Sequence, residues 1–158
     1  MRLYVKNMTE KFAAEILSWK YTKPYDFYNS ELTSEALSEM LEESYFALVD
    51  SDDELVGFFC IGESAQVPAG NPFGAYNKGC VDIGIGMKPV LTGKGCGYEF
   101  LTFILSYVQQ NFPDQAIRLT VATFNKRAIH IYEKVGFTKE KAFHTEAAEF
   151  ITMVKQVN

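Results

Sequence analysis

The segment from Val81 to Phe100 constrains the fold of this chain more than any other. It begins with an apolar run, passes through Lys88-Pro89, and reaches the glycine-rich sequence Thr92-Gly93-Lys94-Gly95-Cys96-Gly97. Apolar residues then recur at the spacing of one helix face, at Leu101, Ile104, Leu105 and Val108. This spacing predicts a helix from about Gly95 to Asn111, which the chain enters from a strand through the glycines.

Alternate glycines leave the start of this predicted helix without side chains. Gly93, Gly95 and Gly97 would let a ligand approach the first N–H groups of the helix, which have no partner within it. These groups and the positive end of the helix dipole bind anions, so the turn is typical of a phosphate site. The alternative is that the glycines only make a tight turn.

Spacing excludes two common phosphate-binding motifs. A Walker loop needs Ser or Thr after the lysine, whereas Gly95 follows Lys94 here. A dinucleotide fingerprint needs a third glycine, and the positions that should hold it are Pro89, Tyr98 and Phe100.

The segment resembles the acyl-CoA pyrophosphate loop of the GCN5-related N-acetyltransferases (GNAT), Gln/Arg-x-x-Gly-x-Gly/Ala. Thr92 stands where the family has Gln or Arg, so contacts from the backbone are expected in place of that side-chain contact. The resemblance implies that the loop binds the diphosphate of acetyl-CoA, a co-substrate, through Thr92, Gly93, Lys94, Gly95, Cys96 and Gly97.

A second motif strengthens the resemblance. Asn125 to Phe137 matches the family's Asn-x-x-Ala-x-x-x-Tyr-x-x-x-Gly-Phe, with Tyr132 at the tyrosine position. Asn125 and Tyr132 are seven residues apart, so they share one face of a helix. Asn125 and Gly136 also suit the two ends of a helix, a purely structural explanation that does not account for Tyr132. The resemblance implies that Asn125 contacts the cofactor.

The remaining patterns predict a single α/β domain over residues 1–158, of the α+β type with a mixed sheet. Strands are expected at Met1–Lys6, Tyr45–Asp50, Leu55–Ile61, Cys80–Met87, Ile117–Ala122, near Phe137 and at Glu149–Lys155, and helices after Thr9, Thr33, Gly95 and Asn125. Cys80–Met87 and Ile117–Ala122 should be parallel because a crossover helix joins them. The resemblance implies a GNAT-like, mostly antiparallel sheet in which these two strands splay apart.

The resemblance also implies that the pantetheine arm of the cofactor enters between these strands and pairs with the backbone near Ile85 and Met87, as an added strand would. Gly84 and Gly86 suit such close approach, or a bulge. The N–H group near Met87 is expected to polarise the thioester carbonyl.

Tyr132 is the predicted general acid, because a phenol with a reference pKa of about 10 can donate to a departing thiolate at neutral pH. The alternative is a buried tyrosine whose hydroxyl bonds to a nearby carbonyl. Asp82 is the predicted general base, with a solvent-facing residue at the strand start as the alternative. Glu63 is a second candidate base, and His130 is expected at the surface.

Three segments are candidates for the acceptor side. The aromatic stretch Trp19–Asn29 either walls the acceptor pocket, as the resemblance implies, or is a loop pinned by large rings. Gly62–Gly79 is a long connection that could form a lid, with contacts from Glu63, Gln66, Phe73 and Tyr76. The helix after Thr33 carries an acidic face that is either solvated or attracts a cationic acceptor: Glu35, Glu39, Glu42 and Glu43.

Composition narrows the function classes. A net charge of −5 without a basic run argues against nucleic acid as a partner. Three cysteines without a C-x-x-C pair, and two histidines, predict neither a disulfide framework nor a metal site. No apolar stretch predicts a membrane span, and a cytoplasmic location is expected.

Together these features predict an acetyl-CoA-dependent N-acetyltransferase that acts on a primary amine of a small molecule or peptide. A non-catalytic acyl-CoA sensor or partner-binding module is the alternative, and a homodimer stays open.

Overall fold

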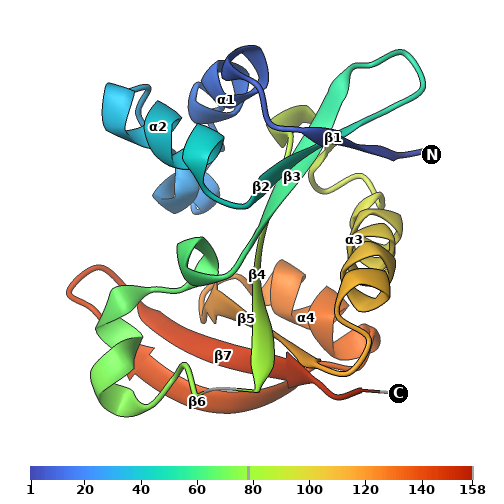
Figure 1. Cartoon of the computed structure of the whole chain (residues 1–158). Helices are drawn as coiled ribbons and strands as arrows, with labels where there is room; N and C mark the ends of the chain where they lie inside the picture. Colours follow the sequence, from blue (N-terminus) through green and yellow to red (C-terminus); the bar gives the residue numbers. More distant parts are fainter. Residues whose placement is uncertain (78, 158) are drawn as a thin grey trace. The chain divides into compact units, whose positions relative to one another are not determined.

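Figure 1 shows a computed structural model of the chain, which describes residues 1–77 and 79–157. The strands are β1 (Tyr4–Asn7), β2 (Tyr45–Val49), β3 (Leu55–Ile61), β4 (Cys80–Met87), β5 (Ala116–Ala122), β6 (Thr138–His144) and β7 (Glu149–Lys155). The α-helices are α1 (Glu10–Leu17), α2 (Ser34–Glu42), α3 (Gly97–Asn111) and α4 (Lys126–Lys134). The predicted order of strands and α-helices is confirmed.

The strands form a seven-stranded mixed sheet in the order β1-β2-β3-β4-β5-β7-β6. Contacts between residues group the chain into two compact units. The first unit comprises Met1–Cys60 and Ile85–Phe100, and the second comprises Ile61–Gly84 and the chain from Leu101 onward. Both β4 and α3 contribute residues to each unit. The expectation of a single domain stays a prediction.

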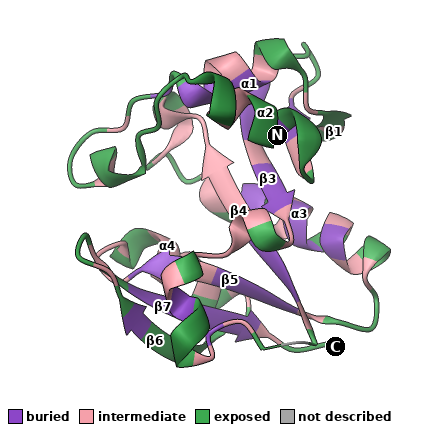
Figure 2. Cartoon of the chain, turned by 60° about the vertical axis from the view of Figure 1, so that its left-hand side comes forward, coloured by how far each residue is buried: buried purple, intermediate pink, exposed green. Residues whose placement is uncertain are grey.

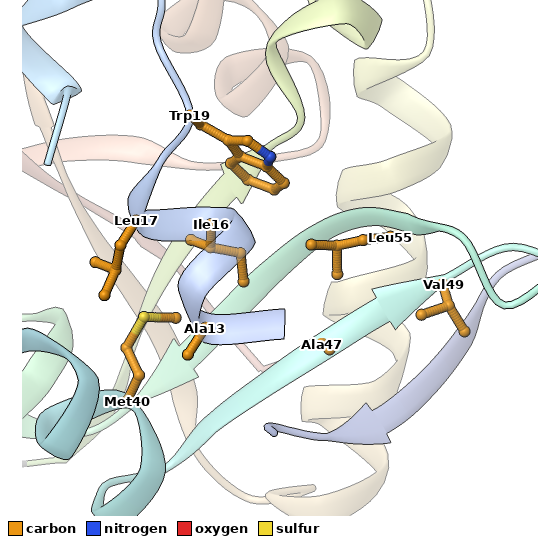
Figure 3. Packing of buried hydrophobic residues seen from close by; sticks show 8 residues of the cluster. All are labelled: Ala13, Ile16, Leu17, Trp19, Met40, Ala47, Val49 and Leu55. Carbon is orange, nitrogen blue, oxygen red and sulfur yellow. The ribbon is translucent and has the colours of Figure 1, made fainter. Parts of the chain in front are cut away.

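In the first unit, β2 pairs antiparallel with both β1 and β3. Helices α1 and α2 pack on these strands through one apolar cluster, shown in Figure 3: Ala13, Ile16 and Leu17 from α1, Trp19, Met40 from α2, and Ala47, Val49 and Leu55 from the strands. The side chains of Thr9 and Thr33 accept hydrogen bonds from Phe12 N and Ala36 N, which confirms both predicted N-caps.

The spacing of the apolar residues predicts one buried face for α2, made of Ala36, Leu37, Met40 and Leu41, and this prediction is wrong at one position. Leu41 is exposed, whereas Met40 is buried in the cluster. The reason is that α2 buries only a narrow stripe, so the rest of its surface, drawn green in Figure 2, faces solvent.

In the second unit, the first half of β4 pairs with β5 in parallel, from Cys80↔Ala116 to Ile83↔Leu119. This confirms the predicted parallel pair. β7 lies between β5 and β6 and is antiparallel to both. Residues Phe150 to Val154 of β7 are all buried, as expected for a strand that is covered on both faces.

The connection after β3 is a packed part of the second unit. It forms two short 3-10 helices, Glu63–Ala65 and Pro68–Phe73. Ala75 is fully buried beside Phe143, and a Cβ added at Gly70 would lie 2.9 Å from Ala75 and from the Phe143 ring. The lid function of this connection stays a prediction, and Lys78 at its end lies outside the described residues.

Candidate functional site

The glycine loop of the first unit takes the backbone conformation that glycine favours. Gly93 and Gly95 have φ angles of 71° and 81°, in the left-handed region. A Cβ on Gly95 would meet nothing within 4 Å, so its backbone angle, and not lack of space, calls for glycine there. The side chain of Thr92 donates to Pro89 O at 2.7 Å, which holds the entry to the loop.

Helix α3 starts directly after this loop. Its first i to i−4 bond runs from Phe100 N to Cys96 O at 3.1 Å. The N–H groups that precede Phe100 in the first turn therefore have no i−4 carbonyl within the helix, which is the arrangement that binds anions. Gly93, Lys94 and Gly95 are exposed, so the loop backbone is open to solvent.

The end of β4 presents its backbone groups in two directions. Lys88 N donates to Val56 O of β3 at 2.8 Å. Because backbone groups alternate along a strand, those of Ile85 and Met87 point to the edge away from β3. Tyr21 reaches this edge and donates its hydroxyl to Met87 O at 2.7 Å. Burial raises the pKa of Tyr21 to about 12, so the hydroxyl is protonated at neutral pH.

The close approach predicted at Gly86 has a cause within the protein. A Cβ on Gly86 would lie 2.1 Å from the ring of Phe58, and one on Gly57 would lie 2.5 Å from Gly86 O. Glycine is therefore needed here for packing of β3 on β4, whether or not a ligand lies beside β4.

In the second unit, α4 carries the second predicted motif. The side chain of Asn125 accepts from Ala128 N at 3.2 Å, so it caps the helix. Gly136 has a φ of 107°, and Phe137 N donates to Tyr132 O at 3.0 Å, which ends the helix. The structural explanation of Asn125 and Gly136 is thus confirmed, and contact of Asn125 with a cofactor stays a prediction.

Tyr132 lies near the end of α4 and is partly buried. Its ring meets the buried Phe137 ring edge to face, with centroids 5.9 Å apart. This contact fixes the position of the ring relative to the C-terminal end of α4.

Asp82 is 5 % exposed and lies in a buried ion pair, so the prediction that it could face solvent is wrong. Its Oδ1 accepts from Arg118 Nε at 2.7 Å, and its Oδ2 accepts from Arg118 Nη2 at 2.8 Å and from Gln66 Nε2 at 2.9 Å. The cause is the parallel register, which places Asp82 directly opposite Arg118.

Sequence reasoning missed Arg118, whose only signal was a single charge inside the apolar run of β5. Arg118 is 2 % exposed, and its hydrogen bonds to Asp82 raise the pKa of the guanidinium above its ordinary value. The guanidinium also donates to Asn77 O at 2.8 Å and lies 5.3 Å from the centre of the Tyr76 ring.

Tyr76 extends this network to Thr120, two residues after Arg118 on β5. Its hydroxyl lies 2.7 Å from the hydroxyl of Thr120 and accepts from Val67 N at 2.9 Å. Gln66 and Tyr76, predicted as lid contacts, therefore bind the connection to the sheet of their own unit.

The other predicted side chains lie at the surface. Glu63, Phe73 and His130 are exposed, which confirms the surface position expected for His130. The acidic residues of α2 line an open depression together with two serines: Ser34, Glu35, Ser38, Glu39, Glu42 and Glu43. Tyr45 donates to Glu39 at 3.2 Å from the neighbouring strand.

Within residues 1–77 and 79–157, no cluster of three or more His, Cys, Asp or Glu side chains has the arrangement of a metal site. No helix in the same residues has both the length and the apolarity to cross a membrane.

Comparison with known protein families decides the family. Residues 11–137 match the model of the acetyltransferase (GNAT) family. The chain belongs to the GNAT family. No curated protein matches it significantly.

Solved structures with the same fold extend over nearly the whole chain. A chimera of the spermidine N-acetyltransferase SpeG from Vibrio cholerae with hSSAT is 18% identical with a TM-score of 0.70, covering 99% of this chain and 96% of that chain. A GNAT-family acetyltransferase from Bacillus anthracis is 15% identical with a TM-score of 0.68, covering 99% and 95%. A protein provisionally described as a phosphinothricin N-acetyltransferase is 15% identical with a TM-score of 0.72, covering 99% of both chains. At these identities the likeness shows the fold.

Proposed function

We propose that this GNAT protein transfers the acetyl group of acetyl-CoA to a primary amine of a small molecule or peptide. The observation that carries the proposal is the glycine loop, in which Gly93 and Gly95 take left-handed angles directly before α3. The start of a helix can bind many anions. Membership of the GNAT family supports acetyl-CoA as the ligand of this loop.

The backbone of the loop, from Thr92 to Gly97, binds the diphosphate of the cofactor in this proposal. Thr92 already donates its hydroxyl proton to Pro89 O, so its contribution comes from the main chain. The ammonium of Lys94 is exposed and adds a positive charge beside the phosphates. Cys96 contributes its N–H group, and Asn125 is a further proposed contact of the cofactor.

The pantetheine arm of the cofactor lies along β4 in this proposal and pairs with the backbone of Ile85 and Met87. The Lys88 N–H group bonds to Val56 and the Met87 carbonyl accepts from Tyr21, so both sides of this peptide are held. The N–H group of Met87 is the proposed donor to the thioester oxygen, where negative charge develops as the amine attacks.

The reaction joins the amine nitrogen to the thioester carbonyl carbon. The new C–N bond forms, the C–S bond breaks, the nitrogen gives one proton to solvent, directly or through a base, and the departing thiolate takes one proton from the hydroxyl of Tyr132. The tyrosinate then regains a proton from solvent, so the enzyme returns to its starting state. A tyrosine suits this step because a phenol, with a reference pKa of about 10, can donate a proton to a thiolate at neutral pH.

Asp82 was predicted to be the base that removes the amine proton. Its carboxylate accepts two hydrogen bonds from the guanidinium of Arg118 and one from Gln66, so both of its oxygens are engaged within the fold. An Asp82→Asn variant separates the two roles. If Asp82 is the base, the variant should lack the acidic limb of the pH profile of kcat/KM. If Asp82 is structural, the variant should keep this limb and be less stable.

The class of the acceptor is broad in this proposal. The acetyltransferases with the same fold include ones named for spermidine and for phosphinothricin, which share only an amino group. The surface of α2 offers four exposed carboxylates, and a cationic amine would be drawn toward it.

Calorimetry and thiol release test the proposal together. Acetyl-CoA should bind saturably to the purified chain, and free thiol should appear when primary amines are added. Saturable binding without thiol release across an amine panel would favour the sensor. No heat on titration with acetyl-CoA would exclude both functions.

A further inference from the structure

Gly57 of β3 lies where this strand meets two other elements of the first unit. It is buried, and a Cβ added to it would overlap the ring of Phe100 on α3 and would lie 2.5 Å from Gly86 O on β4. A glycine inside a strand often marks such a close approach by another part of the chain. Gly57 therefore makes room for two neighbours at once.

These two neighbours support the two halves of the proposed acetyl-CoA site. Phe100 N makes the first i to i−4 bond of α3, to Cys96 O in the glycine loop. Gly86 lies between Ile85 and Met87, whose backbone is proposed to pair with the pantetheine arm. All of these residues belong to the first unit, as the glycine of β3 does. One glycine thus lies against both the start of the proposed phosphate-binding helix and the strand of the arm.

Both neighbours are held in place by the core. The ring of Phe100 is buried, with 2% of the residue exposed. A Cβ on Gly86 would meet the ring of Phe58, and Lys88 N, two residues further along the chain, donates to Val56 O. A close-packed interior has no space for an extra methyl group. A side chain in place of the β3 glycine would therefore displace the start of α3, the end of β4 or both.

The spacing between these two parts matters because acetyl-CoA is a single molecule. In the proposed function its diphosphate binds the backbone of the glycine loop while its thioester lies at Met87. Binding energy from a remote part of a substrate raises kcat only when it helps to hold the reacting group in the right geometry. A misplacement of about 1 Å can cost about 100-fold in rate.

We propose that Gly57 is a positioning residue for acetyl transfer. Through the Phe100 ring and the Gly86 carbonyl, it sets the spacing between the glycine loop and β4, so that binding of the diphosphate places the thioester correctly. This inference rests on the proposed acetyl transfer and goes beyond it, because it gives a role to a residue that belongs to neither motif.

Two acetyl donors test the inference. S-acetylpantetheine carries the same thioester and arm as acetyl-CoA but lacks the nucleotide with its diphosphate. With the primary amine that gives the fastest thiol release, the wild-type kcat for acetyl-CoA should exceed that for S-acetylpantetheine about 100-fold. In Gly57→Ala this donor ratio should fall to about 10, because the diphosphate then no longer places the thioester correctly.

Gly70→Ala is the matched control in the second unit. A Cβ on Gly70 would lie 2.9 Å from Ala75 and from the ring of Phe143, so alanine is crowded there as well. This variant should lose stability and keep the wild-type donor ratio. Thermal unfolding of both variants checks that each is folded at the assay temperature, and a similar fall of the ratio in Gly70→Ala would overturn the inference.

A double variant tests whether the Phe100 ring transmits the effect. Phe100→Leu alone should lower the donor ratio, because the start of α3 loses its support. Combined with Gly57→Ala, the shorter side chain gives space to the added methyl group, so the double variant should keep more of the ratio than the product of the two single effects. Effects that simply multiply would contradict a shared contact and overturn the inference. Phe100→Leu also serves if Gly57→Ala does not fold.

The failure of this inference differs from the failure of the proposed function. An equal kcat for both donors in the wild type, or an unchanged donor ratio in Gly57→Ala, would overturn the inference while acetyl transfer stands. If acetyl-CoA binds without thiol release, the same comparison is made on the dissociation constants of the two donors. A lack of acetyl-CoA binding to the wild type would instead remove the proposed function.

Discussion

The two units differ in how they treat buried polar side chains. In the second unit, Asp82, Arg118 and Thr152 are buried, and each has a partner: Asp82 and Arg118 bind each other, and Thr152 accepts from Lys141 N. In the first unit, the buried indole N–H of Trp19 has none among the described residues. The difference shows that a charged residue on a central strand, even one predicted to be catalytic, can be paired within the core, while an apolar cluster can contain a tryptophan whose donor has no partner among the described residues.

The largest effect is expected from breaking the ion pair of the second unit. Arg118→Met leaves the carboxylate of Asp82 buried without its charged partner, and such a loss costs about 3–5 kcal/mol of stability. Urea unfolding should show this decrease.

A matched double variant sharpens that result. Asp82→Leu combined with Arg118→Met removes both charges, so it should recover part of the lost stability. A double variant that is less stable than Arg118→Met alone would contradict the view that the unpaired charge causes the loss.

The second prediction concerns Tyr132, whose ring contacts the ring of Phe137. Tyr132→Phe keeps this aromatic contact and removes the acidic proton, so kcat should fall about 100-fold, the lower end of general acid catalysis. Single-turnover assays should show the loss, and calorimetry should show similar acetyl-CoA affinity. An unchanged chemical rate would remove Tyr132 from the mechanism.

The third prediction compares two glycines, one from each unit, that both have a positive φ angle. Gly95 and Gly62 have φ angles of 81° and 95°, and a Cβ would meet nothing within 4 Å of either. Alanine should cost about 1–3 kcal/mol at each position because a side chain is strained at positive φ. Only Gly95→Ala should also weaken acetyl-CoA binding in calorimetry. Equal weakening by Gly62→Ala would show that the effect is general strain.

The smallest effect concerns the pH dependence of the first unit. The pKa of Tyr21 is raised to about 12, so the folded state holds this proton more tightly than the unfolded state, whose reference value is about 10. The stabilisation is complete below about pH 10 and is lost as pH rises toward 12. Tyr21→Phe should lose about 1 kcal/mol at neutral pH, for the bond to Met87, and should show a flatter decline above pH 10.

Denaturant midpoints measured from pH 8 to 12 in both proteins check this sign. Tyr45 contributes its own alkaline loss in both, because burial also raises its pKa, so the difference between the curves isolates Tyr21. An equally steep decline in the variant would contradict the assignment.

Much of the fold could be predicted because its signals are local. Thr9, Thr33 and Asn125 cap the helices that were expected to follow them, since a cap depends on residues three positions away. The parallel pairing of β4 with β5 followed from the helix between them. Leu41 was misplaced because helical spacing shows which residues share a face, but not how much of that face a neighbour covers.

For the predicted site as well, local features could be predicted and long-range contacts could not. The glycine loop was found from spacing, and its left-handed glycines agree with a loop that needs a bare backbone. The environment of Asp82 could not be foreseen, because its partner Arg118 is 36 positions away in the sequence. Lone charges in apolar strands were the only hint, and their pairing depends on strand register.

By itself, the sequence determined the order of the elements, their caps and the two motifs of the GNAT family, because each of these depends on residues a few positions apart. Only the tertiary structure decided that Asp82 is held by Arg118, that Gly86 makes room for Phe58, and that the Trp19 N–H has no partner among residues 1–77 and 79–157. Such outcomes depend on which side chains come into contact after the strands have paired, and local sequence patterns do not predict these contacts.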